Sequence, residues 1–125
     1  MKDDVDSSAE DLERPGGAQL VRMLAALSNP HRLRIVATLA QGSVHVSELA
    51  RQVGLSRPLV HMHLQRLEAA RLVTGRLELS DDGKAMKFFE VAPFAIHLTP
   101  ELVVEASRTL PESETRAETT EKEET

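Results

Sequence analysis

The first half of the chain repeats its apolar residues with the 3.6-residue period of α-helices. One helix is expected over residues 18–27, and a second from Pro30 to about residue 41. Asn29 can cap the second helix, Pro30 suits its first position, and Gly42 follows its end. The residues expected to face inward are Leu20, Val21, Leu24 and Leu27 in the first helix and Leu33, Ile35, Val36 and Leu39 in the second.

Two shorter helices separated by a tight turn are expected next, after an edge strand at most at 44–46. Ser47 is placed to cap the first of them, and Gly54 stands where a chain leaving a helix adopts left-handed backbone. Ser56 is placed to cap the second helix. Pro58 fits in the first turn of that helix, because a backbone N–H there has no partner within the helix. The inward residues are Leu49, Ala50, Val53, Val60, Leu64 and Leu67. This layout is typical of a helix-turn-helix, and also of an ordinary helical hairpin.

After Val73 the apolar period changes from 3.6 to 2, which indicates strands. Residues 76–80 and 85–91 alternate, and the turn residues between them predict a β-hairpin. A hairpin directly after a recognition helix is the wing of a winged helix. The sequence therefore predicts a mainly α fold with a β-hairpin wing, with the recognition helix at about 57–70 and the wing at about 74–92.

Two amphipathic helices flank this three-helix core at its ends. Thr99 can cap the last one and Pro100 can begin it, and it is expected to run to about residue 109. Its apolar stripe is Leu102, Val103, Ala106 and Leu110. A small winged core cannot easily bury this stripe and that of the first helix, so a homodimer interface is expected there. DNA geometry also favours a dimer, because dimers place two recognition helices about one helical turn apart.

Charge divides the chain into three parts. Residues 1–14 hold six acidic and two basic residues, as do residues 111–125, whereas residues 15–110 hold eleven basic and eight acidic ones. The two ends are polar and lack periodicity. We therefore expect a disordered acidic tail at 1–16, a DNA-binding and dimerisation domain at 17–110, and a second disordered acidic tail at 111–125.

Basic charge concentrates around the predicted recognition helix. Five arginines but only one acidic residue, Glu68, lie from Arg51 to Arg76, in a chain whose net charge is −5. Such a window fits a surface that meets a polyanion, although a solvated helix with a surplus of arginine gives the same count.

The outer residues of this region are the candidate DNA-binding set. Gln65 can bond adenine and Arg57 can bond guanine in the major groove. The residues expected at base edges are Arg57, His61, Met62 and Gln65, near the helix start at Pro58. The residues expected at backbone phosphates are Ser56, Arg66, Arg76, Lys84 and Lys87. Any single exposed basic side chain can instead have no role in binding.

With these residues the chain resembles the ArsR/SmtB family of bacterial winged-helix repressors, over about residues 18–110. The stretch LSNPHRLRIVATLAQG is similar to the family's helix before the recognition unit, and LSRPLVHMHL is similar to the start of its recognition helix. His63 matches the family's histidine, and His61 stands where a small polar base-contacting residue is usual. The resemblance implies a dimeric, sequence-specific transcription regulator that binds double-stranded operator DNA, with repression as the expected effect.

The chain departs from the family at two sensing sites. Where many relatives carry Cys-Val-Cys-Glu-Leu, residues 45–49 are His-Val-Ser-Glu-Leu, so soft-metal sensing by that route is not supported. The last helix carries Glu101 and Glu105 with His97 just outside it, which is a poor ligand set for zinc. No cofactor is evident. His45 and His97 are weak candidates for a nickel or zinc site, because imidazole suits both ions.

The inventory of residues narrows the remaining functions. The absence of cysteine excludes disulfides, thiolate metal sites and a cysteine nucleophile, and no phosphate loop or carboxylate pair points to an enzyme. No apolar run predicts a membrane span and the acidic start is no signal peptide, so a cytoplasmic location is expected. Two alternatives stay open. One is a metal- or ligand-gated sensor repressor that uses histidines or a partner protein such as a corepressor. The other is a protein-interaction module on a winged-helix fold.

Overall fold

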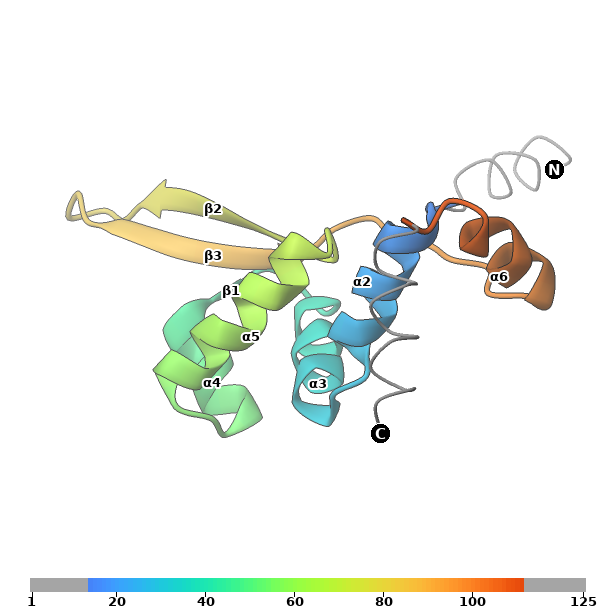
Figure 1. The fold of residues 1–125 in the computed structure, drawn as a ribbon. Coiled ribbons are helices and arrows are strands. Elements are labelled where there is room, and N and C mark those ends of the chain that lie inside the picture. Colours follow the sequence, from blue (N-terminus) through green and yellow to red (C-terminus); the bar gives the residue numbers. More distant parts are fainter. Residues whose placement is uncertain (1–13, 112–125) are drawn as a thin grey trace, which may run out of the picture. The chain divides into compact units, whose positions relative to one another are not determined.

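The computed structural model describes residues 14–111, which form five helices and a three-stranded antiparallel sheet (Figure 1). The elements in chain order are α2 (Gly17–Leu27), α3 (Pro30–Leu39), β1 (Val44–His45), α4 (Val46–Val53), α5 (Arg57–Ala69), β2 (Val73–Leu79), β3 (Ala85–Val91) and α6 (Pro100–Ser107). This is the predicted winged helix-turn-helix with flanking helices. None of the helices described is long and apolar enough to cross a membrane.

The described residues fall into two compact units. Residues 23–94 form one of them, the winged unit, which holds α3, α4, α5 and the whole sheet. The terminal unit brings the described residues up to Arg22 together with those from Ala95 onward. Residues 1–13 and 112–125 lie outside the described part of the chain, so the disorder expected of the two tails stays a prediction there.

Polar caps begin most of the helices as the sequence predicts. The Asn29 side chain accepts hydrogen bonds from the backbone N–H groups of His31 (2.9 Å) and Arg32 (3.2 Å) at the start of α3. Ser56 caps α5 through the N–H of Leu59 (3.3 Å), and Thr99 caps α6 in the same way. These bonds satisfy donors that have no partner within the helix.

The prediction that Ser47 caps α4 is wrong. The cap is His45, whose Nδ1 accepts a hydrogen bond from the N–H of Ser47 at 3.2 Å. The chain passes directly from β1 into α4, so the last strand residue, with its extended backbone, occupies the capping position. The turn that follows α4 is as expected, because Gly54 has left-handed backbone (φ 71°) and its N–H bonds to the carbonyl of Ala50.

The sheet has the order β1-β3-β2, so β1 is the edge strand that the sequence predicts. Val44 pairs with Phe89, and β2 pairs with β3 from Val73↔Val91 to Leu79↔Ala85. The β2–β3 hairpin projects from the helices of the winged unit (Figure 1). The wing thus covers residues 73–91, close to the expected 74–92.

The core of the winged unit is mostly aliphatic and contains one phenylalanine, Phe89. Its most deeply buried side chains include Ile35, Leu49, Val60, Leu64, Leu67, Leu72, Val73 and Phe89, each at most 2% exposed. The three inward residues predicted for α5 are therefore confirmed. They fix the inner side of that helix, which contacts α3, α4 and β2.

Four residues predicted to face inward are exposed instead: Val21 (56%), Leu24 (40%), Leu33 (53%) and Val103 (49%). In α2 the buried residues are Leu20, Met23 and Ala26. This helix is apolar around most of its circumference, so its spacing alone does not select the covered side. Leu33 lies two residues before the buried Ile35, which places it about 200° away around the helix.

The terminal unit is held together by a close approach of α2 and α6. The N–H of Gly17 donates to Thr109 Oγ1 at 2.6 Å. A Cβ at position 17 would lie 2.4 Å from the carbonyl oxygen of Ala106 and 2.7 Å from the Leu110 side chain. Glycine is therefore required by contact rather than by backbone conformation.

One polar side chain lies in the core of the winged unit. His63 on α5 is only 4% exposed, and its Nδ1 lies 3.4 Å from Nη1 of Arg32. A guanidinium only donates hydrogen bonds, so Nδ1 must accept and the ring must be neutral. Arg32 also donates through Nε to the carbonyl of Ala26 at 2.8 Å. Burial, and then the charge of Arg32, lower the pKa of His63.

Truncating a side chain on the inner side of α5 should lower the free energy of unfolding far more than truncating one on its outer side. Leu64→Ala removes a side chain that is 1% exposed and should lower the free energy of unfolding by about 2–5 kcal/mol. Leu59→Ala, at a residue 44% exposed, should change it by no more than about 0.5 kcal/mol. Urea denaturation followed by circular dichroism measures both. Equal losses would mean that the helix is rotated from the orientation described.

Stability should fall in mild acid because of His63. Its pKa is lowered in the folded protein from an ordinary value of 6.5, so the unfolded chain binds the proton more tightly. The contribution of His63 to the free energy of unfolding is fully present above about pH 6.5. It is lost as the pH falls toward the lowered pKa of His63 in the folded protein.

The matched control is His63→Asn, whose side-chain oxygen can still accept from Arg32 but cannot titrate. Other groups titrate in both proteins, so the difference between their denaturation curves at several pH values isolates His63. A difference that does not depend on pH would show that folding does not lower the pKa of His63.

Candidate nucleic-acid interface

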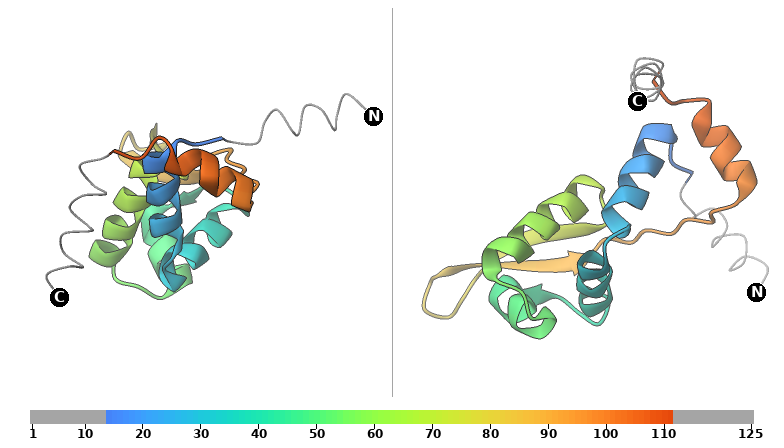
Figure 2. Two further views of the ribbon diagram at one scale, coloured as in Figure 1. Left: turned by 45° about the vertical axis from the view of Figure 1, so that its right-hand side comes forward. Right: turned by 60° about the horizontal axis from the view of Figure 1, so that its bottom comes forward.

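The outer side of α5 carries the residues that the sequence predicts at base edges. The exposed residues between the cap and the last turn are Arg57, Pro58, Leu59, His61, Met62, Gln65 and Arg66. The helix has no acidic residue before Glu68. α4 and α5 lie next to each other in both views of Figure 2 and contact each other, as the two helices of a helix-turn-helix do.

The cations of the basic window are not equivalent. On α4, Arg51 forms an ion pair with Glu48, and Gln52 also donates to that carboxylate at 2.8 Å. The bond from Arg51 lowers the pKa of Glu48, and the bond to Glu48 raises the pKa of Arg51. Neither Arg57 nor Arg66 has an ion-pair partner among residues 14–111. The uncompensated positive charge of the helix-turn-helix therefore lies on α5.

Arg76 on the wing is paired twice. Its Nε lies 2.7 Å from an oxygen of Glu78 on the same strand, and Nη1 bonds to Glu90 on β3. The hydrogen bond to Glu78 is the main reason that the pKa of Arg76 is raised. All three side chains are nearly half exposed, so the pairs are screened by solvent.

The other two wing cations are exposed and have no ion-pair partner in the described part of the chain. Lys87 holds its Nζ 5.3 Å from the centre of the Phe89 ring, a cation–π contact. Lys84 follows the hairpin turn, where its backbone N–H bonds to Asp82 (3.4 Å). Bonds from Ser80 and from this N–H lower the pKa of Asp82.

The wing as a whole is not basic. Residues 73–91 contain four acidic side chains, Glu78, Asp81, Asp82 and Glu90, and three basic ones. The sequence interpretation missed this balance because the basic window that it counted ends at Arg76, before all four acidic residues.

The two histidines predicted as weak metal ligands lie in different units. His45, in the winged unit, uses Nδ1 to cap α4 and packs its ring edge-on against Phe88 at 5.6 Å. His97 is an exposed residue of the terminal unit. Within residues 14–111 no three His, Asp or Glu side chains gather as a metal site would require.

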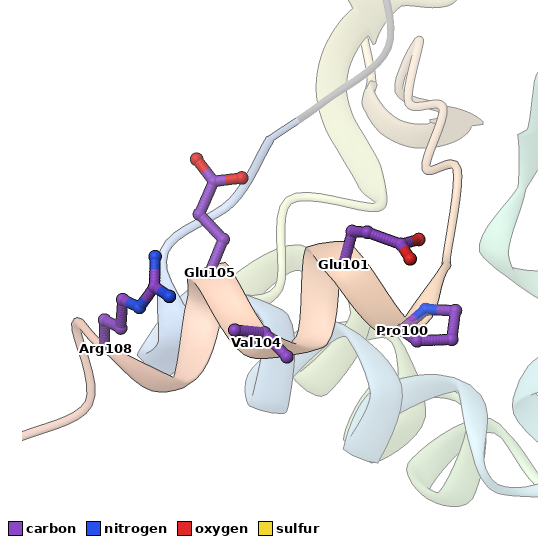
Figure 3. A pocket seen from close by; sticks show the side chains of 5 residues that line it. All are labelled: Pro100, Glu101, Val104, Glu105 and Arg108. Atoms are coloured by element: carbon purple, nitrogen blue, oxygen red, sulfur yellow. The ribbon is translucent and has the colours of Figure 1, made fainter.

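A surface depression lies along α6. Its lining residues are Pro100, Glu101, Val104, Glu105 and Arg108, all on α6 or at its end (Figure 3). The lining comes from one helix and mixes two carboxylates with a guanidinium. It offers no converging set of ligands for a metal ion or a small molecule.

Known proteins match both the sequence and the fold. A family model described as bacterial regulatory protein, arsR family, matches residues 29–74, from the cap of α3 to the start of β2. A helix-turn-helix-type transcriptional regulator of Methanocaldococcus jannaschii is 36% identical over 84 residues, which is 67% of this chain and 87% of the relative. The biofilm growth-associated repressor of Xylella fastidiosa is 33% identical over 78 residues, covering 61% and 68% of the two chains.

Solved structures agree. The chain is similar to the homodimeric winged helix-turn-helix DNA-binding domain of a possible ArsR-family regulator from Mycobacterium bovis, with a TM-score of 0.55, 25% identity and coverage of 73% and 74%. It is also similar to HlyU from Vibrio cholerae, with a TM-score of 0.53, 25% identity and coverage of 73% and 87%. The matching segment contains the helix-turn-helix, and the relatives are named as regulators rather than enzymes. This chain belongs to the ArsR family of regulatory proteins.

Proposed function

We propose that this protein is a dimeric transcription regulator, a repressor, that binds a specific operator in double-stranded DNA through α5 and the wing. One observation carries the proposal. The exposed side of α5 presents polar, basic and apolar side chains without an acid before Glu68, on a chain whose net charge is −5. A recognition helix contacts base edges with its N-terminal residues, which are the ones exposed here.

The side chains divide into two roles. Arg57, His61, Met62 and Gln65 face base edges from α5, and Arg66 and Ser56 contact phosphates beside them. On the wing, Lys84 and Lys87 contact phosphates directly. Arg76 contacts a phosphate only by exchanging its bonds to Glu78 and Glu90, so its net contribution is smaller.

Exposed apolar residues support the dimer. In the terminal unit Val21 is 56% exposed, Val103 is 49% exposed and Val104 is 51% exposed. Such side chains are covered when a second copy packs on the same helices, and the similar domain from Mycobacterium bovis is homodimeric. A dimer presents two copies of α5 to two half-sites of the operator.

The second candidate function is a protein-interaction module, which the excess of acidic over basic side chains on the wing favours. A nickel- or zinc-gated repressor stays a weaker proposal, because Nδ1 of His45 is already engaged as a helix cap.

Selection of bound fragments from the protein's own genome, at low and at physiological salt, tests the proposed function. We expect enrichment of an inverted repeat that persists at the higher salt, because base contacts do not depend on counterion release as phosphate contacts do. Binding that shows no preferred sequence and vanishes as salt rises would instead favour the interaction module.

The two wing cations should differ in their contribution to salt dependence. Lys87→Ala should weaken binding to all sequences alike and reduce the slope of log K against log[salt] by about one. Arg76→Gln should reduce it by clearly less, because two carboxylates already compensate Arg76. Fluorescence anisotropy over a range of salt concentrations gives both slopes.

Arg108→Gln removes the same charge from the terminal unit and controls for net charge. Equal reductions in slope for the two wing variants would mean that Arg76 leaves its carboxylates on DNA. A loss confined to some sequences would mean that Lys87 contacts bases rather than phosphates.

A further inference from the structure

Three apolar side chains lie beside one another on the exposed side of α5. Leu59 is 44% exposed and Met62 is 39% exposed, and Pro58 is exposed next to them. Met62 is four residues after Pro58 and three after Leu59, spacings that make side chains neighbours on a helix. We call these three residues the apolar strip.

The core does not account for the strip. The inward positions of the same turns are filled by Val60 (0% exposed) and Leu64 (1% exposed). Single exposed apolar residues are ordinary on protein surfaces. Three adjacent ones, in the first two turns of a recognition helix, occupy the part of the helix that meets base edges.

The surroundings of the strip fit DNA better than an apolar protein surface. Arg57 and Arg66 flank it, neither with an ion-pair partner among residues 14–111, and the nearest acidic residue of the helix is Glu68. An apolar partner would have to bury those guanidinium groups without compensation, which is costly. DNA provides phosphates for them.

The major groove offers an apolar group of one kind, the 5-methyl group of thymine. We propose that Leu59 and Met62 recognise thymine methyl groups, so that each operator half-site carries A·T pairs beneath the strip. This inference rests on the proposed function. Gln65, three residues after Met62, is placed to pair with an adenine beside that contact.

Replacement of thymine by deoxyuridine, one position at a time in the selected operator, tests the inference. The substitution removes a methyl group and leaves base pairing and charge unchanged. The wild-type protein should bind about fourfold less tightly for each methyl group that the strip buries. Leu59→Ala and Met62→Ala should each bind thymine and deoxyuridine equally at one position, with an unchanged salt slope.

Two further variants complete the test. Leu59→Met keeps an apolar side chain and should retain the preference for thymine. Leu33→Ala truncates a leucine on α3 that is exposed to a similar extent (53%, against 44% for Leu59), and this variant should also retain the preference. A wild-type protein that binds its operator but ignores every deoxyuridine overturns the inference alone. The inference is also overturned if both Leu59→Ala and Met62→Ala still prefer thymine to deoxyuridine at every position. Failure to select any sequence overturns the proposed function instead.

Discussion

The rotation of α5 about its own axis is the constraint on which the interface depends. Val60, Leu64 and Leu67 hold that rotation, because each is at most 1% exposed and packs within the core. His63 adds a polar anchor through Arg32, which also binds the carbonyl of Ala26 at the end of α2. A rotation by one residue would turn the helix by about 100° and carry Met62 and Gln65 away from the side that we propose meets the groove.

Local rules explain why much of the fold is predictable from the sequence. Asn29, Ser56 and Thr99 cap helices through bonds to residues two or three positions away, and Gly54 takes left-handed backbone in a turn that requires it. Prediction fails where two residues compete for one capping position, or where a helix is apolar on several sides. His45 takes the cap expected of Ser47 because strand and helix are joined directly. Which side of α2 is buried depends on its contacts with other elements, and the spacing of its own apolar residues does not reveal those contacts.

The candidate interface is predictable to the same degree. Its residues on α5 follow by elimination once the inner residues are known. The pairing of Arg76 with Glu90 joins residues fourteen positions apart and depends on strand register, so it cannot be derived from composition. Leu59 falls outside the inward positions of α5 in the sequence, but it was not among the predicted contacts because a leucine offers no hydrogen bond to a base edge. Its exposed fraction of 44% in the fold is the observation that makes it a candidate contact.

These features together bear on how such a protein would separate its operator from other DNA. Non-specific affinity grows with the number of phosphates neutralised. Here Arg51 and Arg76 are paired with carboxylates, and acidic side chains outnumber basic side chains on the wing. The unpaired cations of the candidate interface are Arg57 and Arg66 on α5 and Lys84 and Lys87 on the wing, which limits the number of phosphates that it can neutralise. In the proposed complex, base contacts from α5, polar and apolar, would add to this electrostatic part of the binding free energy, and they are the contacts that depend on the DNA sequence.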